Sequence, residues 1–276
     1  MRHPTILPSE PTASRIRLGQ QWVEYRVRRS ARSRSLRVTV DPRLGLVVSI
    51  PPATRRGWAR PDGHIEAFLR EREAWIIRHL ERLARERDSA RALGGARDGG
   101  RVLYRGTPHR IRVGPRAVPG RRSVVERAGG ETEDELVVSL ATGERRPLDR
   151  VLGAWLRERA TAAIDAAVAV HARALGVNPT KVDIRDPKSR WGSASRQGRL
   201  MFSWRLILGP PASLETVVVH ELAHLRVFGH GPAFWALVAS RRPSHLADRA
   251  WLRRHAHGLH TALEPGDEPE VASAGT

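Results

Sequence analysis

The stretch HELAHLRVFGH, from His220 to His230, decides how this sequence is interpreted. Two histidines flank a glutamate at positions i and i+4, and a third histidine follows six residues after the second. On an α-helix, positions four apart lie on one face, so His220 and His224 can direct their imidazoles at one ion. Glu221 lies one step further round the helix, where it can reach water at the metal without being a ligand. The spacing predicts a zinc hydrolase site with Glu221 as general base.

A catalytic zinc ion needs a third protein ligand, and we expect it to be His230. A continuous helix would carry His230 about 9 Å beyond His224, so the helix must end and the chain must turn back. Gly229 supplies a permissive backbone for that turn, and Gly231-Pro232 stops any continuation of the helix. The alternative third ligands are Asp248, Glu264 and His245.

The surroundings of the motif favour a functional site over a chance pattern. The preceding Pro210-Pro211 suits the first turn of a helix. Leu214, Val218, Leu222 and Leu225 form an apolar face on that helix. A metzincin would carry glycine where this chain has Val227, and would need a methionine after the motif. Met1 and Met201 both precede it, so the metzincin class is disfavoured.

Composition limits the other possibilities. The chain has 276 residues, a net charge of +19 and no cysteine, so thiolate ligands, disulfides and cysteine nucleophiles are excluded. Lys181 and Lys188 are the only lysines, and the arginine excess fits either a GC-rich genome or binding of anions and nucleic acid. We expect no membrane span, no secretory signal and a cytoplasmic location.

Hydrophobic periodicity predicts an α+β fold with a β-rich N-terminal part. The HExxH motif makes the following region zincin-like, and its helix is expected to lie beside a small β-sheet. A helix over 148–175 should end at Gly176, followed by strands over 181–186 and 199–209, a hairpin turn at Gly198, and helices from Pro211, Pro232 and Leu246. Residues 115–134 are expected to form a loop. We expect a disordered lead-in (1–14), a β-rich part (15–146), a catalytic region (147–262) and a disordered tail (263–276). Within the β-rich part, one helix is expected over 63–87 and a Gly-rich linker over 88–101.

Two residues outside the motif are candidates for contacts with the substrate or the oxyanion. Arg190 precedes a strand that can form the edge of the cleft, where an extended peptide could pair with the backbone. His245 is the second candidate. We expect Phe234 and Trp235 to pack behind the site and His171 to be a structural residue of its helix.

The segments RDPKSRWGSAS (185–195) and GRLMFSWRLILGPPASLETVVVHELAHLRVFGHGPAFW (198–235) resemble the YgjP-like metal-dependent hydrolases, also called YgjP-like metallopeptidase domains and related to SprT-like zincins. The resemblance extends over roughly residues 16–260. It implies that His220, His224 and His230 are zinc ligands and that Glu221 is the catalytic glutamate. Family members often have cysteine where this chain has Ala194, so that cysteine is not essential to the chemistry.

The expected function is a zinc-dependent metallopeptidase acting on a peptide or protein. A first alternative is a metal-dependent phosphohydrolase of nucleotides such as UTP, favoured by Arg185, Arg190 and Arg205 near the site in sequence. A second alternative, of another class, is a nucleic-acid-associated protein whose basic N-terminal half binds phosphates.

Overall fold

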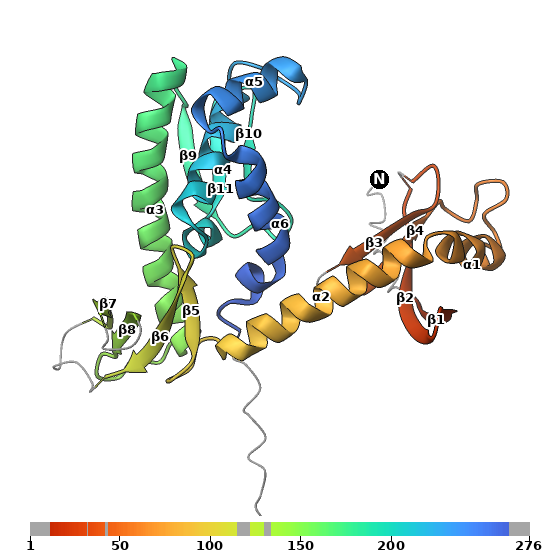
Figure 1. Cartoon of the computed structure of the whole chain (residues 1–276), viewed down its shortest axis with the longest axis horizontal. Coiled ribbons are helices and arrows are strands. Elements are labelled where there is room, and N and C mark those ends of the chain that lie inside the picture. The colour runs from red at the N-terminus through yellow and green to blue at the C-terminus, as the bar shows by residue number, and fades with distance from the viewer. Residues whose placement is uncertain (1–11, 32, 42–43, 115–121, 130–133, 265–276) are drawn as a thin grey trace, which may run out of the picture. The chain divides into compact units, whose positions relative to one another are not determined.

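The computed structural model describes residues 12–31, 33–41, 44–114, 122–129 and 134–264. Contacts divide the chain into two compact units, Met1–Arg85 and Glu86–Thr276. The fold is α+β with a β-rich N-terminal part, as the sequence predicts (Figure 1). No helix in the described ranges is both long and apolar enough to cross a membrane. The cytoplasmic location stays a prediction.

The first unit contains a four-stranded sheet in the order β1-β2-β4-β3. Ile16 and Leu18 of β1 are buried while Arg17 between them is exposed, the alternation of a half-buried strand. β1 begins at Thr12, which pairs with Val27, so residues 12–14 do not belong to a disordered lead-in. Residues 1–11 lie outside the described ranges. The strands are β1 (Thr12–Leu18), β2 (Gln21–Arg29), β3 (Arg37–Asp41) and β4 (Gly45–Ile50).

Two helices replace the single helix predicted over 63–87. α1 (Asp62–Glu71) and α2 (Glu73–Leu93) are separated at Arg72, and both bury apolar side chains in the core of the sheet, including Ile65 and Ile76. α2 extends six residues into the predicted linker, because that polar stretch is rich in good helix formers. The rest of the predicted linker is also structured, since backbone hydrogen bonds join Gly99 and Gly100 to Ile111.

The second unit begins with another four-stranded sheet, in the order β5-β6-β8-β7. Val102, Ile111 and Leu136 of this sheet share one hydrophobic core with the long helix that follows. The compact units therefore do not coincide with the division predicted at residues 146/147. A strand, β7, also occupies part of the predicted loop at 115–134; residues 115–121 and 130–133 are outside the described ranges. The strands are β5 (Arg101–Tyr104), β6 (Thr107–Val113), β7 (Val124–Gly129) and β8 (Asp134–Ser139).

The long helix and a small sheet form the frame of the candidate site. α3 (Leu148–Leu175) has the predicted bounds and ends at Gly176, whose φ of 64° suits a left-handed cap. β11 lies between antiparallel β10 and parallel β9. The predicted strand over 199–209 is wrong after Ser203, because the chain turns into the 3-10 helix η1 (Trp204–Leu208) and buries Trp204. The strands are β9 (Lys181–Arg185), β10 (Gly192–Ala194) and β11 (Arg199–Ser203).

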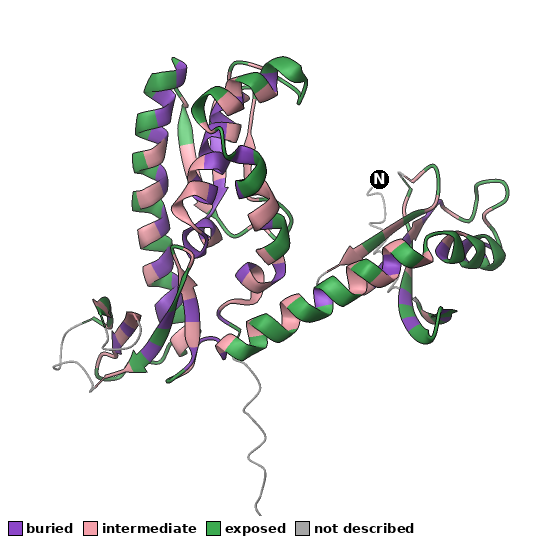
Figure 2. Cartoon of the chain, in the orientation of Figure 1, coloured by how far each residue is buried: buried purple, intermediate pink, exposed green. Residues whose placement is uncertain are grey.

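Three helices complete the unit: α4 (Pro211–Ala223), α5 (Pro232–Arg241) and α6 (His245–Thr261). α4 buries the predicted face of Leu214, Val218 and Leu222 in the core shared with α3, while His220 is only half-buried. Figure 2 shows α3 exposed along one side and buried along the side that faces the other elements of this unit. Leu263 does not belong to the disordered tail predicted over 263–276, because it packs into this core. Residues 265–276 lie outside the described ranges.

Candidate metal centre

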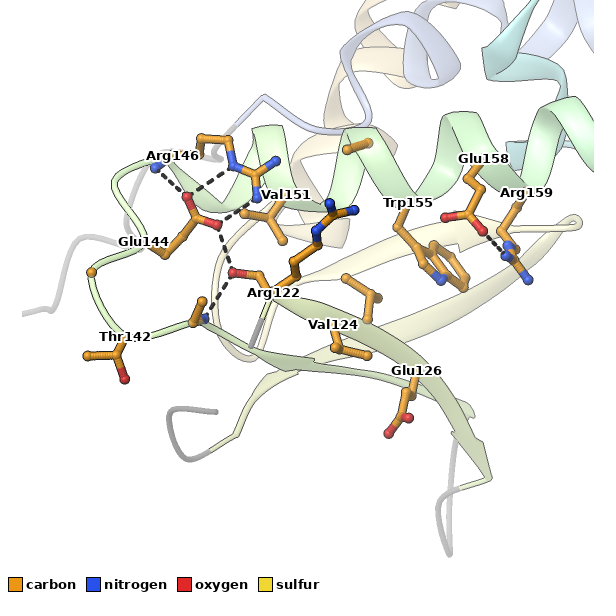
Figure 3. Close-up of a pocket in the computed structure, with 15 residues that line it drawn as sticks. Arg122, Val124, Glu126, Thr142, Glu144, Arg146, Val151, Trp155, Glu158 and Arg159 are labelled. Atoms are coloured by element: carbon orange, nitrogen blue, oxygen red, sulfur yellow. Dashed lines mark hydrogen bonds and ion pairs between the residues drawn. The ribbon is translucent and has the colours of Figure 1, made fainter. Parts of the chain in front are cut away.

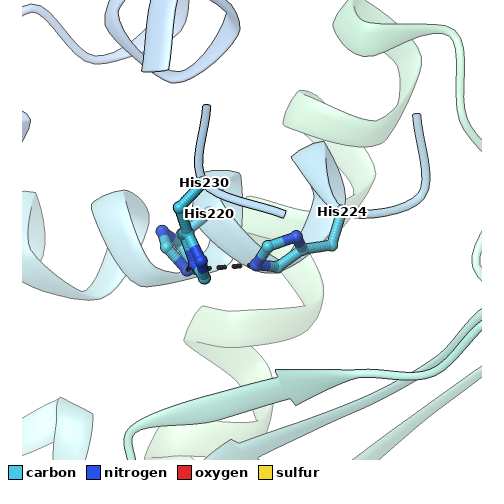
Figure 4. A group of neighbouring side chains, drawn as sticks. All are labelled: His220, His224 and His230. Carbon is cyan, nitrogen blue, oxygen red and sulfur yellow. Dashed lines mark hydrogen bonds between the residues drawn. The ribbon is translucent and has the colours of Figure 1, made fainter. Parts of the chain in front are cut away.

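The three histidines of the motif converge on one point (Figure 4). Nε2 of His220 lies 3.3 Å from Nε2 of His224 and 3.2 Å from Nε2 of His230. The ligand atoms of all three lie within 4.8 Å of one another, a grouping that could hold a metal ion. Four ligands about 2.05 Å from zinc in a tetrahedron are about 3.3 Å apart, so the two measured separations match two edges of such a site. Three imidazoles would leave the fourth position open.

His230 reaches this point because the helix ends where the sequence requires. The backbone N–H groups of Arg226 and Val227 still donate to the carbonyl of Ala223, which closes the last turn of α4. Gly229 then adopts a φ of +89°, a conformation that side chains rarely take. α5 starts at Pro232, immediately after the turn. The predicted reversal at Gly229 is confirmed.

The aromatic rings of Phe234 and Trp235 pack against the three imidazole rings. The ring of the fully buried Phe234 lies 4.4 Å from that of His224 and 4.9 Å from those of His220 and His230, measured between centroids. Trp235 stacks on His230 at 5.6 Å. These contacts restrict the orientations of the three rings, which is the packing role expected for Phe234 and Trp235.

Glu221 is buried beside the histidines but is not part of their group. Its side chain lies against the backbone of β10 at Gly192, where a Cβ atom would be 2.7 Å from Oε1 of Glu221. The glycine of the WGS stretch therefore leaves the space that the carboxylate occupies. This contact could not be predicted from the sequence, because nothing in the spacing of residues 192 and 221 relates them.

Burial dominates the electrostatics of these side chains. It lowers the pKa of His220 to about 3, with the charges of His224 and His230 acting in the same direction. Burial also lowers the pKa of His224, which has a backbone hydrogen bond with Val227. The same effect raises the pKa of Glu221 to about 7, opposed by the charge of Arg190. Neutral imidazole is the form that binds a metal ion.

A pocket of about 330 Å³ opens beside the histidines. His220, Glu221 and His230 form one wall, and β10 contributes Gly192. Arg249 and Arg253 of α6 also line the pocket, although neither is among the site residues predicted from the sequence. His245, Arg249 and Arg253 follow one another at intervals of four residues, so they lie on one face of a helix. This spacing could have identified the two arginines from the sequence.

The two predicted contact residues lie near the site but do not line this pocket. Arg190 is exposed, and its charge acts on Glu221. His245 is buried, its ring stacks on Trp235 at 5.6 Å, and its Nδ1 has no hydrogen-bond partner among the described residues. Their roles in catalysis stay predictions.

The alternative third ligands are not brought to the histidines. Asp248 is buried in a different network, in which its Oδ2 accepts from Thr216, from Ser244 at 3.0 Å and from Arg242 at 3.3 Å. That carboxylate is already satisfied as a structural group that ties α6 to α4. His171 is likewise structural, since it is buried on α3 and faces Glu215 at 3.9 Å.

Two arginines that favoured a nucleotide substrate also lie elsewhere. Arg205 donates to Asp186 at 2.7 Å and to the carbonyl of Leu259 at 3.0 Å. Arg185 is exposed on β9 and lies 4.0 Å from Asp183. Neither lines the pocket at the histidines, so their nearness in sequence does not become nearness to the site.

A larger hollow of about 960 Å³ lies between β7 and α3 (Figure 3). One of its three lining glutamates, Glu144, accepts hydrogen bonds from Arg146 at 2.6 Å and from Ser123 at 2.7 Å. The hydrogen bond from Arg146 keeps the pKa of Glu144 well below its usual range. Among the described residues no histidine lines this hollow, and Glu144 is already paired, so the size of the hollow alone does not make it a catalytic site.

Comparisons with known proteins agree with the chemistry of the three histidines. No curated protein matches the chain significantly. A crystal structure of the metallopeptidase zymogen of Pyrococcus abyssi abylysin is 21% identical, with a TM-score of 0.29 over a match that covers 33% of this chain and 93% of that chain. The profile described as "YgjP-like, metallopeptidase domain" matches residues 34–255, which is most of the sequence. The chain therefore belongs to the YgjP-like family of metallopeptidase domains and is a metal-dependent hydrolase.

Proposed function

We propose that this chain is a zinc-dependent metallopeptidase of the zincin type, with His220, His224 and His230 as ligands and Glu221 as general base. The observation that supports the proposal is the convergence of three imidazoles beside a buried carboxylate, with Nε2 of His224 and of His230 lying 3.3 and 3.2 Å from Nε2 of His220. An all-nitrogen set of three ligands suits catalytic zinc better than magnesium or calcium, which prefer oxygen. When bound, the ion would act as a Lewis acid on water and on the substrate carbonyl.

Each part of the site then has a task in peptide hydrolysis. A carboxylate oxygen of Glu221 takes the proton from the attacking water and returns it to the leaving amine. Gly192 leaves the space in which that carboxylate lies. β10 has β11 on one side and no strand on the other among the described residues, so an extended peptide can pair with its free edge. Arg190 and His245 are the candidates for stabilising the oxyanion.

The test is hydrolysis by the zinc-loaded protein of casein or a peptide library, with nucleoside triphosphates in a parallel assay. Cleavage of peptide bonds that disappears in Glu221→Gln, while zinc content is unchanged, is the expected result. Phosphate release from nucleotides without peptide cleavage would support the phosphohydrolase alternative and overturn the peptidase proposal. Full peptidase activity in Glu221→Gln would show that the base is a different group.

A second candidate function, association with nucleic acid, has its own support in the first unit. On the outer face of the β1–β4 sheet, exposed arginines alternate with buried core residues, and the exposed Trp22 lies among them. None of these arginines forms an ion pair within the described ranges, and Glu24 and Asp41 are the only acids on the same strands. The face consists of Arg15, Arg17, Arg26, Arg28 and Arg37.

The register makes this face a regular array of positive charge. Arg28 and Arg37 both flank Ser49 of β4, one from each side. Residues two apart on a strand are about 6.8 Å apart, and adjacent strands about 4.8 Å. Arg17 is opposite Trp22, so a base could stack on the indole while guanidinium groups contact the phosphates. We therefore propose single-stranded nucleic acid as the partner of this face.

Binding of the full chain to a single-stranded oligonucleotide at several salt concentrations tests this partner. Replacing Arg26, Arg28 and Arg37 together by Gln should weaken binding and reduce the salt slope by about 2, given roughly 0.7 per lost phosphate contact. The matched control replaces Arg70, Arg78 and Arg85 by Gln, which removes the same charge from α1 and α2. Equal losses in both variants would mean that net charge, and not this face, is responsible.

A further inference from the structure

The pocket beside the histidines carries two positive charges that the proposed mechanism does not use. Arg249 and Arg253 are four residues apart on α6, and both line the pocket together with His220 and Glu221. Residues at this spacing lie about 5–6 Å apart at Cβ on the same face of a helix. Both guanidinium groups therefore border the space in which a substrate would lie.

Arg249 is held in place before any ligand binds. Its guanidinium carbon lies 4.2 Å from the centroid of Trp235, a cation–π contact. Trp235 is itself fixed, because it stacks on His230 at 5.6 Å and on His245 at 5.6 Å. The stack from His230 through Trp235 to Arg249 ties the position of this charge to that of the metal site. Such an arrangement reduces the entropy that is lost when a ligand is bound.

Neither arginine has an acidic partner among the described residues, in contrast to other arginines of the same unit. Arg242 pairs with Glu215 at 2.6 Å, and Arg205 pairs with Asp186 at 2.7 Å. Glu221 is the only carboxylate that lines the pocket. Burial lowers the pKa of Arg249, and the charge of Arg253 adds to this effect, so the two guanidinium groups repel each other. A metal ion at the histidines would make the pocket still more positive.

We propose that Arg249 and Arg253 form a subsite for a carboxylate of the peptide substrate, so that the enzyme prefers bonds close to a free C-terminus or to an acidic side chain. Two neighbouring guanidinium groups can contact both oxygens of a carboxylate through charge-assisted hydrogen bonds. The pocket's volume of about 330 Å³ suits one side chain or a chain end better than a long segment. This substrate class rests on the peptidase function proposed above.

Binding to zinc-loaded Glu221→Gln protein tests the subsite without requiring catalysis. The probes are short peptides that differ only in a C-terminal acid or amide, and a second pair with internal Glu or Gln. We expect at least one acidic member to bind about 10-fold more tightly than its neutral partner. Arg249→Gln and Arg253→Gln should each remove this preference, whereas Arg254→Gln, an exposed position on α6 outside the pocket, should retain it.

In the active enzyme, the same arginine variants should raise KM for the acidic peptide with little change in kcat. Arg249→Lys keeps the charge, so a partial preference is expected from it. Zinc content and circular dichroism of each variant show whether it is folded. Equal binding of both members of both pairs, or a preference that survives in Arg249→Gln and Arg253→Gln, would overturn the proposal.

Two further outcomes separate this subsite from the proposed function. An acid preference in binding, combined with no peptide cleavage by the active protein, would leave the subsite standing and reject the peptidase. Inorganic phosphate or a nucleoside triphosphate serves as the competing probe. If these displace a bound reporter at concentrations where free dicarboxylates do not, the subsite is for phosphate, and the carboxylate proposal is wrong.

Discussion

A Cβ atom at Gly192 would lie 2.7 Å from Oε1 of Glu221, so the central carboxylate of the site occupies space that only glycine leaves on β10. This contact joins the edge strand to the helix that carries the histidines. It makes Gly192 a positioning residue for the proposed general base.

Gly192→Ala should therefore reduce activity without removing the metal. The added methyl group would displace the carboxylate, and a shift of about 1 Å in a catalytic group can cost on the order of 100-fold in rate. We expect kcat to fall by roughly this factor, with unchanged zinc content, in peptidase assays and metal analysis. Ser193→Ala, a change of similar size on the same strand, is the control. An active Gly192→Ala protein would show that Glu221 is not held by this contact.

A comparison of His230→Ala with Asp248→Ala distinguishes the ligand from the structural acid. The first change should lower the zinc stoichiometry and leave the fold intact, because His230 is exposed at the end of a turn. The second should retain zinc but reduce the free energy of unfolding by about 3 kcal/mol, as expected when a buried charge pair loses one partner. Zinc analysis and urea unfolding measure the two effects. The opposite pattern would assign the third ligand to Asp248.

The motif could be predicted in detail because its geometry is local. His220, His224, Gly229 and His230 lie within eleven residues, and helix periodicity and glycine conformation relate them directly. The bounds of α3 were predicted for the same reason. The apolar pattern marks the extent of a regular helix, and Gly176 marks its C-terminal end. Local rules were sufficient wherever the relevant residues are neighbours in the chain.

The errors arose where contacts distant in sequence override local signals. β1 exists because β2 pairs with it, and β7 because it pairs with β8, although both begin in polar stretches. The region after Ser203 has strand-like composition, but burial of Trp204 and its neighbours favours a 3-10 helix. The contact between Gly192 and Glu221, and the place of Arg249 in the pocket, likewise depend on packing between separate elements.

Phe234 should be important for both stability and metal binding. Its ring is fully buried and lies within 5 Å of all three imidazole rings, between centroids. Phe234→Ala removes this support, and we expect a loss of about 3–5 kcal/mol in the free energy of unfolding. Phe234→Leu, which fills more of the space, should lose less and should bind zinc more tightly than Phe234→Ala. Equal zinc affinity in wild type and both variants would contradict the supporting role.

His171 should make the protein less stable as the pH falls. It is buried on α3, and burial lowers its pKa below the ordinary value of 6.5; Glu215 opposes the effect, while Arg241 and Arg242 add to it. Below pH 6.5 the unfolded chain therefore takes up a proton that the folded chain does not, and the free energy of unfolding decreases with falling pH. His171→Gln removes the proton uptake that accompanies unfolding at this position.

Urea unfolding at pH 8 and pH 5.5 measures the effect in wild type and in His171→Gln. Both proteins are treated with chelator first, so that the metal-binding histidines contribute alike to each. We expect wild type to lose more stability than the variant between the two pH values. The difference between the two losses belongs to His171, because all other titrating groups are shared. If the variant loses as much as wild type, His171 accepts a proton in the folded protein as readily as in the unfolded chain.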